Sequence, residues 1–166
     1  MDSRKSFSLS SIVANIVDDE GPIQVDLLLE RIKELAGVSR IGSNIQSNFE
    51  KALRMAIREE KIERITDDKN FVYKAGAKYL HFRTPANGVE RRLDQISKVE
   101  IRNAVEFLIK DQFGLAYDNA LQGVKHVFGI SRVDPEEGDR VKDLIDEMIS
   151  SNVIIRHGPL LHLVVS

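Results

Sequence analysis

The sequence contains no cysteine among its 166 residues, which excludes disulfide bonds and thiolate chemistry and suits a reducing compartment. It also lacks the long apolar run of a signal peptide in its first residues, MDSRKSFSLSSIV. No apolar stretch approaches the roughly 20 residues that a membrane-spanning helix needs. The net charge of −2 argues against a strongly basic surface that binds nucleic acid over the whole protein, but it does not exclude local basic patches. We therefore expect a cytoplasmic chain without a membrane partner.

Motifs for catalysis are missing as well. The sequence has no Gly-rich phosphate loop of either standard spacing. Ser43 is typical of a helix cap rather than of a nucleophile, and most carboxylates stand beside basic residues, as on solvated helix faces. The histidines have neither metal-ligand spacing nor a cysteine partner; they are His81, His126, His157 and His162. We expect no enzymatic activity, no cofactor, no metal ion and no small-molecule substrate.

One short phrase occurs twice. Gly-Val-Ser-Arg occupies residues 37–40 and Gly-Ile-Ser-Arg occupies residues 129–132, an offset of 92 positions. The same offset aligns residues 9–57 with residues 101–149 without a gap, and the apolar positions match almost throughout. A fixed period of this kind indicates two copies of one supersecondary unit. The alternative is chance similarity between amphipathic helices.

The first copy predicts three helices and a hairpin. Apolar residues from Leu9 to Val17 follow helical spacing, and Gly21-Pro22 stops that helix. After a short extended piece at 23–25, Asp26 is expected to cap a second helix, which Gly37 ends. Ser43 and Gln46 form a capping-box pattern at the start of the third. Residues 61–65 and 71–73, joined by turn residues 67–70, predict a β-hairpin.

The second copy repeats this order. Ser97 and Glu100 form a capping box before the first helix, and residues 115–117 are the short extended piece. Asp118 is expected to cap the second helix and Asp134 the third, with Pro135 in the first turn of the third. Residues 153–156 and 160–165 predict the hairpin.

Helix, short strand, helix, turn, helix and hairpin is the order of a winged helix, a helix-turn-helix with a β wing. We therefore predict an α+β, predominantly helical chain of two tandem winged-helix units, residues 1–80 and 97–166. Residues 81–96 form the connection, which we expect to be a partly ordered linker because its neighbourhood contains apolar Tyr79, Leu80 and Phe82.

The third helix of the first copy has a polar stripe with basic residues. In a helix-turn-helix this element enters the major groove, where cations meet phosphates and amides meet base edges. The candidate nucleic-acid-binding residues are Arg40, Asn44, Ser47, Asn48, Lys51, Arg54 and Arg58, with Lys61, Arg64 and Lys69 extending the set into the hairpin. The alternative is an ordinary solvated helix surface, since Glu50, Glu59 and Glu60 interrupt the pattern.

The 92-residue offset inverts the charge of this stripe. Lys51, Arg54 and Ser47 become Asp143, Asp146 and Asp139. Carboxylates repel a phosphate backbone, so these three aspartates are candidates for binding a basic partner or for packing. Arg40 and Arg132 hold the same place in both copies, which favours a structural role such as bonding to turn carbonyls; phosphate contact by Arg40 is the alternative.

The pattern EGP…V-[DE]-x-L…G-[VI]-S-R-x-G-S lies within EGPIQVDLLLERIKELAGVSRIGSNIQSNFEKAL, and RRLDQISKVEIRNAV and FGISRV follow the hairpin. On these residues most of the chain resembles an uncharacterised C-terminal domain of large bacterial helicase-like proteins of superfamily I, often found beside a nuclease-like domain. The resemblance implies an accessory module of a DNA-processing protein. It supplies no catalytic residues, and the chain lacks motor and nuclease motifs, so ATPase activity is not carried over.

These observations favour weak, non-enzymatic binding of duplex DNA, mainly through the first copy, in support of a helicase-like or nuclease-like domain. The rival hypothesis is a protein-interaction or dimerisation module built on the same scaffolds, whose acidic third helix docks a basic partner. A further alternative is a transcription regulator, which needs a symmetric dimer and a palindromic site.

Overall fold

The computed structural model describes residues 8–65, 68, 70–88 and 90–165. The chain divides into two compact units, Met1–Ala77 and Lys78–Ser166. Within the described residues it is α+β and mostly helical, with six α-helices and two three-stranded sheets. The expected fold class is thus confirmed at this level.

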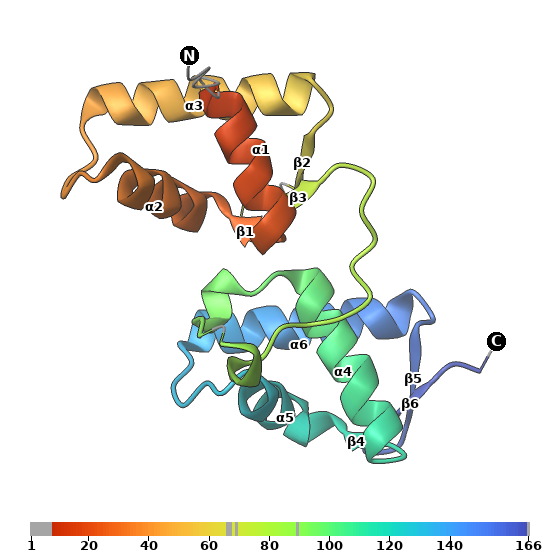
Figure 1. Cartoon of the computed structure of the whole chain (residues 1–166). Coiled ribbons are helices and arrows are strands. Elements are labelled where there is room, and N and C mark those ends of the chain that lie inside the picture. The colour runs from red at the N-terminus through yellow and green to blue at the C-terminus, as the bar shows by residue number, and fades with distance from the viewer. Residues whose placement is uncertain (1–7, 66–67, 69, 89, 166) are drawn as a thin grey trace. The chain divides into compact units, whose positions relative to one another are not determined.

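The first unit consists of three helices and a small sheet (Figure 1). Its elements are α1 (Leu9–Glu20), β1 (Ile23–Gln24), α2 (Val25–Ala36), α3 (Ser43–Arg58), β2 (Ile62–Ile65) and β3 (Phe71–Lys74). The sheet has the order β1-β3-β2, and both pairings are antiparallel. The connection between β2 and β3 includes predicted turn residues Asp67 and Lys69, which lie outside the described residues.

The core of the first unit depends on the apolar face of α3. Phe49, Leu53 and Ala56 are at most 1% exposed, and α3 packs against α1, where Val13 and Val17 are fully buried. The two helices cross in Figure 1. Burying such side chains is the main favourable contribution to folding a small domain, so these positions determine which face of α3 points to solvent.

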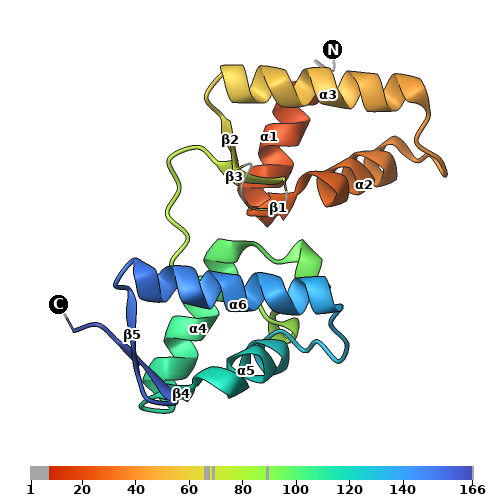
Figure 2. The same cartoon turned by 180° about the vertical axis from the view of Figure 1, so that it is seen from behind.

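The second unit repeats this arrangement with additional short helices. Its elements are η1 (Pro85–Asn87), η2 (Leu93–Gln95), α4 (Lys98–Asp111), β4 (Leu115–Ala116), η3 (Tyr117–Asn119), α5 (Ala120–Val127), α6 (Pro135–Ser150), β5 (Ile154–His157) and β6 (Leu160–Leu163). The antiparallel sheet has the order β4-β6-β5. Figure 2 shows α6 passing in front of α4, with α5 below it. Both α3 and α6 have 16 residues and begin 92 positions apart, the offset found in the sequence.

Several predicted helix caps are wrong. The N-cap of α2 is Gln24, so Asp26 lies in the first turn instead, where its charge still favours the positive end of the helix dipole. Asp118 lies in η3, and α5 begins only at Ala120. The N-cap of α3 is Gly42 without a side-chain hydrogen bond, so the Ser43–Gln46 capping box does not form.

Other predicted helix ends are confirmed. Asp134 is the N-cap of α6, and Pro135 follows in its first turn. Gly37 ends α2 with a φ of 67°, the left-handed conformation that favours glycine. Ser97 caps α4 by accepting a hydrogen bond from the Glu100 N–H, but the Glu100 carboxylate does not complete a capping box because it binds two arginines.

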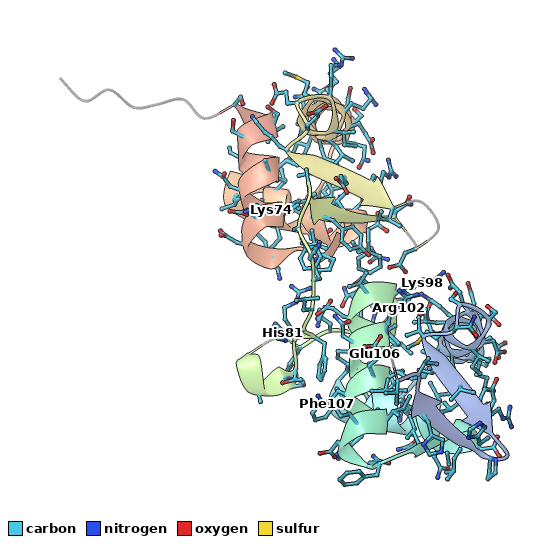
Figure 3. The ribbon with its side chains drawn as sticks, turned by 90° about the vertical axis from the view of Figure 1, so that its right-hand side faces the viewer. Lys74, His81, Lys98, Arg102, Glu106 and Phe107 are labelled. Atoms are coloured by element: carbon cyan, nitrogen blue, oxygen red, sulfur yellow. The ribbon has the colours of Figure 1, made fainter. Side chains whose placement is uncertain are left out.

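The segment from residue 78 to 96 belongs to the second unit. It runs along α4, with His81 beside the helix (Figure 3), and the Asn103 side-chain amide donates to the carbonyls of Tyr79 and His81 at 2.9 Å each. The Phe82 ring packs 5.6 Å from that of Phe107, measured between centroids. Leu93, at 3% exposure, joins the core of the unit. The contacts therefore make this predicted linker part of the fold.

Glu100 holds this segment to α4 by ionic hydrogen bonds. Its carboxylate is 2% exposed and accepts from Arg83 Nη2 at 2.9 Å and from Arg91 Nη1 at 2.6 Å. Burial acts to raise the pKa of Glu100, but the hydrogen bonds from both arginines outweigh it and leave the pKa below its ordinary value. The cluster therefore stabilises the ionised carboxylate.

We predict that Glu100→Gln destabilises the second unit by about 3 to 5 kcal/mol, because it leaves two guanidinium groups without their buried counter-charge. Urea denaturation of the full chain, with hydrogen exchange read in α4, measures this loss. The control is Glu106→Gln, the same change elsewhere on α4 at a side chain that is only partly buried. Equal stability of the two variants would contradict a role for the ion cluster.

The same cluster predicts a pH dependence. Because the pKa of Glu100 is lower in the folded than in the unfolded chain, its contribution is fully present at neutral pH and disappears as the pH falls through the folded-state pKa. Denaturation midpoints measured from neutral to acidic pH should therefore converge for the wild-type chain and Glu100→Gln. A constant gap between the two curves would be inconsistent with this assignment.

Candidate nucleic-acid interface

The solvent-facing side of α3 carries the predicted polar stripe. Because Phe49 and Leu53 point into the core, residues on the opposite face of the helix are exposed. The exposed predicted residues of this helix are Asn44, Ser47, Asn48, Lys51, Arg54 and Arg58. The structure therefore brings these six side chains together on one face of one helix.

The three cations of this face have no partner in the described part of the chain. Lys51, Arg54 and Arg58 form no ion pair within 4.0 Å there. Glu50 precedes Arg54 by one turn but accepts a hydrogen bond from the Gln46 side chain at 3.3 Å instead. The helix thus presents on its exposed face three positive charges that no described residue pairs with.

The hairpin contributes less than the sequence predicted. Lys61 is exposed but lies 2.7 Å from the carboxylate of Glu59, which offsets its charge. Arg64 in β2 donates to the Asn70 side chain at 2.9 Å and remains exposed. Lys69 lies outside the described residues.

In the described structure, Arg40 does not hydrogen-bond to the turn between α2 and α3. Its guanidinium is exposed and forms no hydrogen bond or ion pair with any residue that the structure describes, and the same holds for Arg132 in the second unit. The interpretation in which these arginines bond to turn carbonyls is therefore wrong. Arg40 instead stands just before the first turn of α3, where backbone N–H groups give the helix a partial positive charge.

Met55 is a residue of this face that the sequence interpretation missed. Its side chain is 48% exposed and lies four residues after Lys51 and seven after Asn48, on the flank that the asparagines occupy. Its spacing from Asn44 and Asn48 places it on the polar face of the helix and could have identified it from the sequence. It adds an apolar contact surface beside the polar stripe.

The corresponding face of α6 is acidic. Asp139, Asp143 and Asp146 are all exposed, as expected from the offset. Asp146 accepts a hydrogen bond from the Tyr117 hydroxyl at 2.8 Å, and this bond raises the pKa of Tyr117. The Arg156 guanidinium lies 4.2 Å from the centre of the Tyr117 ring. This arrangement holds one carboxylate of the stripe in place.

The described residues contain neither a cluster of metal ligands nor a helix able to span a membrane. No group of three or more histidine, aspartate or glutamate side chains is placed there to hold a metal ion. None of the helices described has both the length and the apolar character needed to cross a bilayer.

Part of the chain is similar to a known protein family. The family described as a protein of unknown function (DUF3320) matches residues 7–47, about a quarter of the chain, which covers α1, β1, α2 and the start of α3. No match was found among curated proteins or solved structures. The matched segment ends before Lys51, Arg54 and Arg58, so the family likeness does not include the cationic part of the stripe.

We predict that Arg40→Ala changes the free energy of unfolding by less than about 0.5 kcal/mol, because an exposed side chain that contacts no partner in the described structure adds little to stability. Urea denaturation of the full chain tests this, with Arg132→Ala as the matched variant in the second unit. A loss well above this limit in both variants would restore the structural role for the two arginines.

Proposed function

We propose that the first unit binds duplex DNA without catalysing a reaction, using the exposed face of α3 and the turn before it. The observation that carries this proposal is a set of three cations on α3 that have no ion-pair partner among the described residues and are flanked by exposed asparagines. Lysine and arginine bind phosphates, and asparagine can bind the base edge of adenine.

We further propose that each unit is a winged helix. The order helix, short strand, helix, helix and two-stranded hairpin supports this, because the short strand β1 pairs with β3 to complete a three-stranded sheet, and β4 pairs with β6 in the same way. In this fold α3 and α6 are the recognition helices. The hairpin of the first unit, through Arg64, then contributes a smaller phosphate contact.

The second unit is proposed to have another task. Three exposed carboxylates at the positions proposed to contact DNA in the first unit would face phosphates at close range. They could not replace the cations condensed on the DNA, as lysine or arginine would. We assign the acidic face of α6 to a protein partner with positive charge.

The wider context is proposed from the sequence resemblance alone. A module of this kind would help a helicase-like or nuclease-like domain to hold DNA. Deleting the module from a helicase-like protein that contains it should weaken DNA binding while the basal ATPase rate is retained. Unchanged DNA affinity after deletion would argue against the accessory role.

DNA binding is tested by fluorescence anisotropy with a labelled duplex and the full chain. The affinity should be weak, with a Kd of about 10⁻⁴ to 10⁻⁶ M at physiological salt. If about four phosphates are contacted, the slope of log K against log salt concentration should be about −3 to −4. The triple variant Lys51→Glu, Arg54→Glu, Arg58→Glu should lose the salt-sensitive binding.

A matched variant separates this site from the effect of net charge. Lys110, Arg132 and Lys142 are exposed cations of the second unit, and reversing all three to glutamate changes the net charge of the chain by the same amount. This control should bind DNA nearly as well as the wild-type chain. Equal losses in both triple variants, or no salt-sensitive binding by the wild-type chain, would refute the proposed interface.

A further inference from the structure

An open groove lies between α5 and α6 of the second unit. It has a volume of about 400 Å³, within the size range of ligand-binding clefts. One wall comes from Asp118 in η3 and from Leu121, Gln122 and Lys125 in α5. The other comes from Val133, Asp134 and the first half of α6. The apolar floor of the groove is formed by Leu121 and Val133, which are only partly buried.

Gly138 keeps the floor of this groove open. A Cβ atom placed at Gly138 would lie 3.3 Å from the Leu121 Cδ2 atom and 3.9 Å from the Val133 Cγ1 atom, so any side chain there would enter the space between them. In the first unit the 92-residue offset places Gln46 at this position. The glycine therefore distinguishes the acidic unit from the basic one at a point that shapes its surface.

The rim of the groove carries charged side chains that form no ion pairs in the described part of the chain. The charged lining residues are Asp118, Lys125, Asp134, Asp139 and Lys142. None of the five forms an ion pair or a side-chain hydrogen bond with another residue in the described part of the chain. The rim has a net charge of −1, three carboxylates against two ammonium groups, and Asp143 continues the negative charge along α6.

We propose that this groove binds a short peptide segment in which an aliphatic side chain is flanked by lysine or arginine. The aliphatic side chain occupies the floor between Leu121 and Val133, and the basic residues pair with Asp118, Asp134 and Asp139. Apolar burial supplies affinity and the carboxylates set the orientation and exclude acidic segments. Nucleic acid is disfavoured, because three carboxylates outnumber Lys125 and Lys142 on the rim and would repel its phosphates.

This inference does not depend on DNA binding by the first unit, but it rests on the proposed assignment of the acidic α6 face to a positively charged protein partner and specifies where that partner binds. It also gives the acidic face of α6 a definite docking position. The three aspartates of α6 are exposed charges, and such charges alone bind a partner weakly. The groove adds an apolar binding surface next to Asp139.

The probe for the test is a fluorescein-labelled peptide, Gly-Lys-Arg-Leu-Leu-Arg-Lys-Gly, titrated with the full chain at low ionic strength. Anisotropy should show saturable binding, and replacing both leucines by serine should weaken it more than about tenfold, as expected for the loss of a buried leucine. A peptide with glutamate in place of the four basic residues should not bind.

Variants of the chain locate the site. Gly138→Gln, which installs the residue of the first unit, should reduce affinity about tenfold or more by filling the floor. Asp139→Lys should reduce affinity by a similar factor, because it reverses a charge on the rim of the groove. Asp143→Lys makes the same change one turn later, outside the groove lining, and should reduce affinity much less. If circular dichroism shows that Gly138→Gln is misfolded, the two aspartate variants and the serine peptide decide the question.

The outcomes that overturn the proposal are distinct from those of the DNA test. Absence of saturable binding to the leucine peptide refutes it. Equal losses for Asp139→Lys and Asp143→Lys, together with equal binding of the serine peptide, show charge attraction without a groove and refute it as well. The triple variant of α3 should bind the peptide like the wild-type chain, so failure of either proposal leaves the other standing.

Discussion

The burial of one face of the third helix is the constraint on which each unit depends. In the first unit, Phe49, Leu53 and Ala56 must point at α1 for the small core to close. A helix that buries one stripe exposes the opposite one at the same spacing. The position of Lys51, Arg54 and Arg58 in solvent is therefore a direct consequence of core packing.

The two units use one core pattern for two different surfaces. Between α3 and α6 the apolar positions of the buried face are retained except Ile45, which aligns with Glu137. On the exposed face, Ser47, Lys51 and Arg54 are replaced by aspartates. Core residues are constrained by their neighbours and surface residues are not, so a repeated unit keeps its fold while its outer face changes. Gly138 extends this difference from charge to shape, because it opens a groove where the first unit has Gln46.

The second unit also shows how a polar contact incorporates a connecting segment into a fold. Glu100 is buried on α4, and its charge is compensated by Arg83 and Arg91 from the preceding segment. A buried carboxylate without these partners would be costly, so the segment and the helix depend on each other. The sequence pattern predicts that the Glu100 side chain completes a capping box. In the structure its carboxylate accepts hydrogen bonds from arginines 9 and 17 residues earlier, which the local pattern does not indicate.

Helix caps were the least predictable part of the fold. Ser43 and Gln46 have the residue types of a capping box, yet the helix begins after Gly42, and Gln46 binds Glu50. Asp26 and Asp118 fail as caps for a similar reason, since the short strands β1 and β4 and the turns after them determine where the helices begin. Cap positions depend on backbone angles over two or three residues, which residue type alone does not specify.

The sequence by itself determined the order of the elements, the 92-residue repeat, the buried faces of the helices and the inversion of charge between them. Each of these follows from periodicity and residue type, which act over a few residues. Only the tertiary structure decided that Arg40 has no partner among the described residues, that residues 78–96 belong to the second unit, and that a groove lies between α5 and α6. These depend on which side chains meet after the chain has folded, and local sequence does not carry that information.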